Sequence, residues 1–134
     1  MLSSVPAAGR RGPLPADSPA ATLLVVDDEP LNRDLLGRRL EQRGFRVVVA
    51  SSGPEALEAL SAQPVNLVLL DVMMPAMSGL EVLTAIRRSA VWRELPVIMA
   101  TARSDSRDIV EALDLGADDY VTKPLDFPVV LARV

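Results

Sequence analysis

The sequence contains no cysteine and no histidine. Without cysteine there are no disulfides, no thiolate metal ligands and no cysteine nucleophile. Without histidine there is no imidazole for general acid–base catalysis or for a Ser-His triad, and nearly all zinc sites are excluded. Aromatic residues make up only 3% of the 134 residues. The chemistry of this chain must therefore come from carboxylates, hydroxyls and cations.

Dense positive charge and long apolar runs are also missing. The 14 basic and 18 acidic side chains give a net charge of −4, which argues against a nucleic-acid-binding surface. No apolar run approaches the roughly 20 residues that span a bilayer, and Arg10 and Arg11 precede no hydrophobic segment of the kind that an export signal needs. We therefore expect a cytoplasmic protein that makes no direct contact with nucleic acid or membrane.

The composition changes near Thr22. Residues 1–21 contain four of the eleven prolines and no hydrophobic periodicity, which predicts a flexible leader rich in proline and alanine. Apolar residues make up 49% of the whole chain, enough for one sizeable core at this length. Residues 22–134 are therefore predicted to form a single domain.

Five short apolar runs in this domain are predicted to be strands. They span residues 23–26, 46–50, 66–70, 96–100 and 119–123. All but the last are continuously apolar, which is typical of parallel strands that are covered on both faces.

Amphipathic segments that follow the strands are predicted to be helices. They span residues 31–43, 54–62, 79–88 and 105–115, with a fifth helix from about Asp126 that is truncated at Val134. Ser52 with Glu55, and Ser78 with Glu81, have the spacing of a capping box at a helix start. In the first helix, four leucines are expected on the core side: Leu31, Leu35, Leu36 and Leu40. Strict alternation of strand and helix predicts a small, open parallel sheet with helices on both faces and right-handed crossovers.

Polar residues gather where the predicted strands end. Ligands of such sheets bind at the carboxyl ends of the strands, and the residues found there are Asp27, Asp28, Glu29, Asp71, Thr101 and Lys123. Neighbouring carboxylates repel one another unless a hard cation such as Mg²⁺ binds between them. An Asp that faces a phosphoryl group is a competent nucleophile, and Asp71 ends the central strand. Lys123 is the only lysine in the chain, so a compact ammonium is favoured there over a guanidinium.

Taken singly, these residues have simpler explanations. The acidic residues 27–29 could cap the first helix, Asp71 could be a turn residue, and Lys123 could be a surface cation. Their joint occurrence at one sheet edge favours a shared site.

Four sequence motifs carry a family resemblance. They are LLVVDDEP (23–30), LVLLDVMMPAMSGLEVL (67–83), PVIMATA (96–102) and GADDYVTKP (116–124). Over residues 22–134 the chain resembles the receiver domain of bacterial two-component response regulators. The resemblance implies an α/β, flavodoxin-like (βα)5 fold, a doubly wound parallel sheet with strand order 2-1-3-4-5. It also implies a signalling switch, not an enzyme acting on other substrates, which takes a phosphoryl group from a histidine kinase or a histidine phosphotransfer protein.

Residue roles follow from the same resemblance, position by position. Asp71 resembles the phospho-acceptor. The Mg²⁺ ligands are implied to be Asp27, Asp28, Asp71 and the backbone carbonyl of Met73. Thr101 and Lys123 resemble the phosphate contacts, Thr101 and Tyr120 the switch pair, and Pro124 the residue after a cis peptide bond. Ser78 replaces the more usual Asp or Asn, and Met73 and Arg103 resemble positions that tune the phosphoryl lifetime.

The resemblance also concerns partners and output. An effector domain is expected after Val134, with a single-domain protein that has a short last helix as the alternative. A homodimer is compatible with the family, and the domain is expected to catalyse only its own phosphorylation and dephosphorylation. Two other classes of protein fit the sequence less well. A phosphatase with an Asp nucleophile would need a second Asp where Met73 stands. A flavin binder or unphosphorylated interaction module does not explain why all the site residues are present, and a flavin binder would need a phosphate loop after the first strand.

Overall fold

The computed structural model describes residues 21–102, 106–123 and 126–134, with the side chains of residue 102 and residues 106–108 left out. Residues 1–20 of the predicted leader and the positions of Arg103 and Pro124 lie outside these ranges. The strands are β1 (Thr22–Val26), β2 (Arg46–Ala50), β3 (Leu67–Asp71), β4 (Val97–Ala102) and β5 (Asp119–Lys123). The helices are α1 (Pro30–Gln42), α2 (Gly53–Ala62), α3 (Gly79–Arg88), α4 (Ser106–Asp114) and α5 (Phe127–Arg133).

All five strands form one sheet in the order β2-β1-β3-β4-β5, and every neighbouring pair is parallel. The predicted flavodoxin-like topology is therefore confirmed. The chain enters the sheet at β1, moves outward to the edge strand β2, and then returns past β1 to the central strand β3. From there it continues through β4 to β5 at the other edge. This reversal next to β1 places the carboxyl ends of β1 and β3 side by side, where such sheets bind their ligands.

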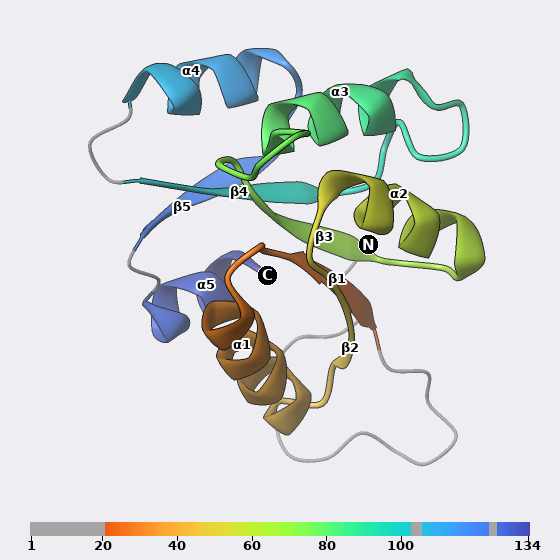
Figure 1. Ribbon diagram of the computed structural model, residues 1–134. Coiled ribbons are helices and arrows are strands. Elements are labelled where there is room, and N and C mark those ends of the chain that lie inside the picture. The colour runs from red at the N-terminus through yellow and green to blue at the C-terminus, as the bar shows by residue number, and fades with distance from the viewer. Residues whose placement is uncertain (1–20, 103–105, 124–125) are drawn as a thin grey trace.

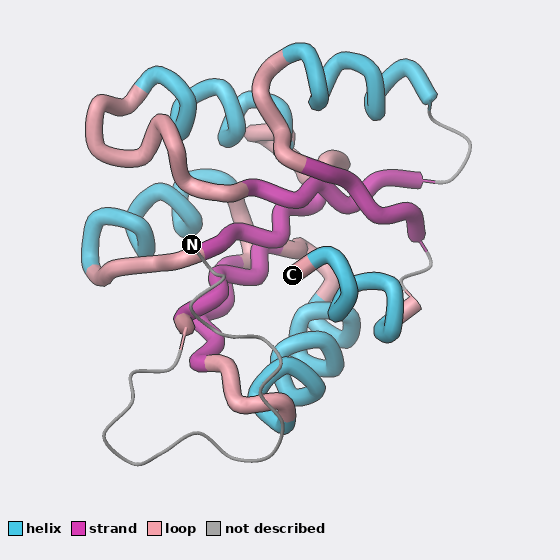
Figure 2. The backbone as a smooth tube through the Cα atoms, turned by 180° about the vertical axis from the view of Figure 1, so that it is seen from behind, coloured by secondary structure: helices cyan, strands magenta, loops and turns pink. Residues whose placement is uncertain are grey.

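The sheet lies between two layers of helices, with α1 and α5 on one face and α2, α3 and α4 on the other (Figure 1; Figure 2 gives the view from behind). Successive residues of β1 point to opposite layers: Leu23 and Val25 pack with α1 and α5, whereas Leu24 and Val26 pack with the other three helices. Because both faces are covered, β1 and β3 are apolar at every core position, as their continuous runs predicted.

The same prediction is wrong for β2. Its residues are mostly half-buried or exposed, and Val49 is 46% exposed. β2 forms the edge of the sheet and pairs only with β1, so the helices cover it incompletely. A continuous apolar run therefore did not distinguish an edge strand from a central one.

The predicted core face of α1 is also partly wrong. Leu36, Gly37 and Leu40 are buried, whereas Leu31 is 73% exposed and Leu35 53% exposed. Each residue turns an α-helix by about 100°, so Leu31 and Leu36 point about 140° apart and cannot share one face. The exposed pair lies on the first two turns of α1, near the carboxyl ends of the strands.

The two predicted capping boxes differ. At α3 the box is complete: the Ser78 hydroxyl accepts a hydrogen bond from the Glu81 main-chain N–H, and Glu81 accepts one from the Ser78 N–H. At α2 only the first half forms, because Glu55 accepts from the main-chain N–H of Ser51 and not from that of Ser52. Among the described helices, none is both long and apolar enough to cross a membrane.

Candidate functional site

Asp71 is the last residue of β3, the central strand of the sheet. It pairs with Ala100 of β4 and is only 3% exposed. Its Oδ1 accepts a hydrogen bond from the main-chain N–H of Met73 at 3.3 Å. A carboxylate at this depth exchanges most of its water for protein contacts, so its charge depends on the groups placed around it.

Asp27 and Asp28 follow β1 directly and differ in exposure. Asp27 is buried and Asp28 is exposed. Asp27 is held firmly: its N–H donates to Ala50 O at 3.1 Å, and its Oδ1 accepts from the N–H of Glu29 at 2.9 Å. The turn made by this side chain leads into α1. Asp27 therefore belongs to the site and fixes the turn before α1, but it does not cap the helix, whose N-cap is Glu29 without a side-chain capping bond.

The carboxylates of Asp27, Asp28 and Asp71 converge. One oxygen from each lies within 4.8 Å of the others. Three hard oxygen donors at this spacing, one of them exposed, suit a divalent cation that keeps part of its water shell, as Mg²⁺ does. The donor set therefore fits the metal that the sequence predicted.

Lys123 supplies the positive charge. Its ammonium Nζ lies 3.0 Å from Asp71 Oδ1 and 3.6 Å from Asp27 Oδ2. The lysine ends β5 and reaches over β4 to two strands that it does not pair with. The only lysine of the chain therefore lies where its charge compensates the acidic cluster.

The pKa of Asp71 is raised from 3.8 to about 6. Burial is the main cause, and the charge of Asp27 acts in the same direction, while Lys123 and the Met73 N–H act against both. The pKa of Lys123 is raised as well: burial lowers it, but the hydrogen bond and the charge of Asp71 together with Asp27 outweigh that effect. The single ammonium therefore compensates the two buried carboxylates only in part.

Thr101 lies in β4 beside Asp71 and is 1% exposed. Its Oγ1 is the one buried side-chain oxygen or nitrogen in the described part of the chain that has no hydrogen-bond partner. Buried hydroxyls are nearly always paired. This free hydroxyl fits a site that binds an oxygen-rich group at the end of β4.

Two supporting residues were missed by the sequence reasoning. Arg33 of α1 donates from Nη1 to the Asp27 carbonyl at 2.8 Å and fixes the β1–α1 turn. Gly79 starts α3 so close to β3 that an added Cβ would overlap the Asp71 carbonyl oxygen. A single sequence gave little signal for Arg33, whereas the glycine directly after the Ser78 cap was a signal that could have been used.

The remaining predicted residues lie around this centre. The side chain of Met73 is 65% exposed, and Glu29 is the exposed N-cap of α1. Tyr120 of β5 is half-buried against the α3 and α4 side of the core and pairs with Met99. Pro124 lies outside the described residues.

The fold and this site define an open, flavodoxin-like α/β domain with an acidic strand-end cluster and one facing lysine. A family model for the response regulator receiver domain matches residues 23–134. The chain belongs to this family: it is a receiver domain of the two-component response regulators.

Relatives of this chain are transcriptional regulators and chemotaxis proteins. KdpE of Mycobacterium tuberculosis is 47% identical over 112 residues, which are 84% of this chain and 48% of KdpE. PhoB of Klebsiella pneumoniae, a phosphate regulon regulator, is 41% identical over 86% of this chain and 50% of its own length. The chain thus spans about half the length of these relatives. The structure of chemotaxis protein CheY4 of Vibrio cholerae is similar with a TM-score of 0.81 and 28% identity, covering 86% of this chain and 96% of CheY4.

Proposed function

We propose that Asp71 accepts the phosphoryl group in this receiver domain. The observation that carries the proposal is the convergence of three carboxylates and one ammonium at the carboxyl edge of the sheet, with Asp71 at the centre. Oδ1 of Asp71 pairs with the Lys123 ammonium and accepts a hydrogen bond from the Met73 N–H. Among the described residues Oδ2 has no hydrogen-bond donor, which leaves it for attack on phosphorus.

The phosphoryl donor is a phosphohistidine of a histidine kinase or of a phosphotransfer protein. The Asp71 carboxylate oxygen attacks phosphorus, the bond from phosphorus to the imidazole nitrogen breaks, and the imidazole leaves. Positioning and charge stabilisation supply most of the catalysis in such transfers. Both are provided by the receiver domain, so it catalyses its own phosphorylation and the later hydrolysis of the aspartyl phosphate.

Charge on the transferred group is compensated from three directions. Lys123 binds one phosphoryl oxygen. The Thr101 hydroxyl, which has no hydrogen-bond partner among the described residues, donates to another. Asp27, Asp28, Asp71 and the Met73 carbonyl are the residues that would hold Mg²⁺. When bound, the cation neutralises the negative charge of the phosphoryl oxygens.

Phosphorylation then acts as a switch. Thr101 moves toward the phosphoryl group, and Tyr120 repacks into the space that becomes available beside β4. Tyr120 is half-buried, so a limited change of packing alters the α4, β5 and α5 surface. The response is a shift between two packings with different affinity for a partner.

Partners of the whole protein follow from the same proposal. Exposed Leu31 and Leu35 of α1 lie near the site and form the docking face for the kinase or phosphotransfer protein. The output is an effector domain C-terminal to this domain, as the lengths of the relatives support, and the regulator acts in the cytoplasm.

The acceptor is tested by phosphorylation with acetyl phosphate and Mg²⁺, followed by intact mass measurement. Wild type is expected to gain one phosphoryl group, and Asp71→Asn none. Asp28→Asn is expected to reduce the yield, because Asp28 is an exposed member of the metal-ligand group. Asp34→Asn on the exposed side of α1 is the matched control and should match wild type. An equal adduct on Asp71→Asn and wild type would contradict the proposal.

A further inference from the structure

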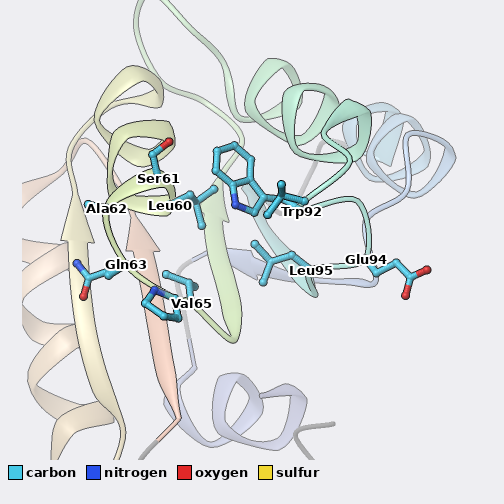
Figure 3. Close-up of a pocket in the computed structure, with 10 residues that line it drawn as sticks. Leu60, Ser61, Ala62, Gln63, Val65, Trp92, Glu94 and Leu95 are labelled. Carbon is cyan, nitrogen blue, oxygen red and sulfur yellow. The ribbon is translucent and has the colours of Figure 1, made fainter.

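A second concave site lies at the opposite edge of the sheet, where the strands begin. It is a pocket of about 550 Å³ between two parts of the chain. One is the end of α2 together with the segment that leads to β3, and the other is the segment between α3 and β4. Leu60, Val65, Trp92 and Leu95 form its apolar wall (Figure 3). The volume lies in the range of pockets that bind small ligands or short peptide segments. The proposed phosphorylation makes no use of it.

The polar character of this pocket is negative. Glu94 is the only residue with a charged side chain among those that line the pocket in the described chain, and in Figure 3 its carboxylate points outward, away from Trp92. α2 ends here with no basic residue in its last turn. The last carbonyls of a helix carry partial negative charge and lack partners within the helix. A segment that combines apolar groups, carbonyl acceptors and positive charge would be complementary to this pocket.

Trp92 gives the pocket an aromatic platform. Its ring faces the end of α2 and lies above Leu95 and Val65 in Figure 3. No hydrogen bond joins its indole N–H to any residue in the described part of the chain, so this donor is free for a main-chain carbonyl. Tryptophan with a nearby acidic group is a recurrent means of binding proline-rich segments that carry arginine.

Such a segment exists in the same chain. Residues 10–15 read Arg-Arg-Gly-Pro-Leu-Pro. Residues 1–20 contain two arginines and one aspartate, and the remaining 12 basic and 17 acidic side chains give residues 21–134 a net charge of −5. The N-terminal segment is therefore positive and the folded domain is negative.

The connection between the two is short. Thr22, where β1 begins, exchanges two hydrogen bonds with Asn66: its N–H donates to Asn66 Oδ1 at 2.7 Å, and its carbonyl accepts from Asn66 N–H at 2.8 Å. Asn66 directly follows Val65 of the pocket wall. About 20 Å of extended chain separates Pro15 from Thr22, which is ample to reach the pocket.

We infer that residues 10–15 bind in the pocket of Trp92 within the same chain. Pro13, Leu14 and Pro15 occupy the apolar wall, and the two arginines lie toward Glu94 and the carbonyl end of α2. A short tether gives a segment an effective concentration of the order of millimolar. A pocket of only millimolar affinity for the free peptide is then substantially occupied in the intact chain.

Paired cysteines test this contact, since the chain has no cysteine of its own. One full-length variant combines Leu14→Cys with Ser61→Cys, an exposed position that lines the pocket. The matched control combines Leu14→Cys with Gln42→Cys, exposed at the end of α1, near the start of β2, whose Arg46 pairs with Thr22. Under mild oxidation the Ser61 pair should form an intramolecular disulfide about tenfold faster than the control pair, and Arg10→Glu with Arg11→Glu should abolish this difference.

Trp92 is the only tryptophan, so its fluorescence gives a second measure in the otherwise unmodified full chain. Replacing Pro13 and Pro15 by serine should increase quenching of Trp92 by acrylamide, while replacing Ser3 and Ser4 by alanine should not. The inference stands only if both measurements agree with expectation. Equal oxidation rates, a disulfide that links two copies, or unchanged quenching would each overturn it.

Discussion

The ionisation of Asp71 depends on two opposing influences at the scale of a single residue. Burial and Asp27 favour the neutral carboxyl, while Lys123 and the Met73 N–H favour the carboxylate. Since burial prevails, the metal-free protein holds this charge at a cost. A site of this kind is prepared to bind cations and, when a divalent ion is present, to present a fully ionised nucleophile.

This cost predicts a pH-dependent stability in the presence of EDTA. The pKa of Asp71 is about 6 in the folded protein against 3.8 for an ordinary Asp, so the folded state binds its proton more tightly. The contribution of Asp71 to the free energy of unfolding therefore falls as the pH rises from about 4 to 6, and it stays low at higher pH. Asp71→Asn removes the penalty. It should be more stable than wild type by about 2–3 kcal/mol at pH 7.5, with little difference near pH 4.

Urea unfolding of both proteins across this pH range, without divalent ions, measures the effect. Because carboxyl groups away from the site contribute equally in both proteins, the difference between the two reports on Asp71 and the groups that it contacts. A constant difference at all pH values would mean that the pKa of Asp71 is not raised.

Thr101 leads to a second prediction at this scale. Its buried hydroxyl has no partner among the described residues, so Thr101→Val removes an unpaired polar group and keeps the shape. The free energy of unfolding should rise by about 1 kcal/mol, measured by urea unfolding without phosphoryl donor. Thr122→Val, at the exposed neighbour on β5, should change it by less than about 0.5 kcal/mol. A clear loss of stability in Thr101→Val would indicate that the hydroxyl is paired.

At the scale of elements, the position of Asp71 depends on how closely α3 approaches β3. The N–H of Gly79 donates to the Val72 carbonyl at 2.8 Å, and a side chain at this position would overlap the main chain at Asp71. The capping box of Ser78 and Glu81 fixes the start of the helix at the same point. The helix and the strand end are therefore built as one unit.

Two glycine substitutions test that unit. Gly79→Ala should destabilise the protein by about 3 kcal/mol or more, because neither backbone can give way without moving Asp71. Gly37→Ala is the matched control: its Cβ would meet Val47 Cγ1 at an ordinary 3.5 Å, and the better helix propensity should add about 0.5–1 kcal/mol. Urea unfolding and limited proteolysis compare the two. Equal effects would show that the approach of α3 is not tight.

Elements also show what the sequence could and could not predict. The three central strands were recognised because both faces of each are covered, so that consecutive residues are apolar. β2 and the first turns of α1 were predicted less well, because the exposure of Val49 or Leu31 depends on how far neighbouring helices extend, which is a tertiary property. Ala76 has a positive φ of 69° in the loop after Asp71, and alanine gives no sign of it.

At the scale of the whole molecule, the two edges of the sheet have different characters. The carboxyl edge, where the strands end, contains the acidic cluster, whose charge changes when a proton, a cation or a phosphoryl group binds. At the opposite edge, where the strands begin, Arg87 of α3 links the segments that lead into β4 and β5. It donates to the carbonyls of Leu95 and Gly116 and pairs with Asp118 at 3.0 Å. Asp118 in turn accepts from the N–H of Val97 at the start of β4. The parallel sheet was predictable from the alternation of strands and helices, whereas its strand order followed from the family resemblance. Arg87 was not predictable, because its partners are mostly main-chain carbonyls.

This separation leads to a prediction about energetic independence. Arg87→Met should lower the unfolding free energy by about 2 kcal/mol, since it leaves carbonyls of two connecting segments without a donor. Arg88→Met, at the exposed neighbour on α3, should change it by less than about 0.5 kcal/mol. A five-residue strand is about 16 Å long, so Arg87 is too far from Asp71 for direct interaction.

The double variant Arg87→Met with Asp71→Asn should therefore have the sum of the two separate effects within about 0.5 kcal/mol, measured by urea unfolding in EDTA at pH 7.5. Additivity means that the acidic site can be charged, neutralised or phosphorylated without weakening the opposite edge, so a change of state stays confined to the carboxyl edge and the helices that meet it. A coupling above about 1 kcal/mol would contradict this. It would mean that the sheet transmits strain along the full length of its strands, and the switch would then involve the whole domain.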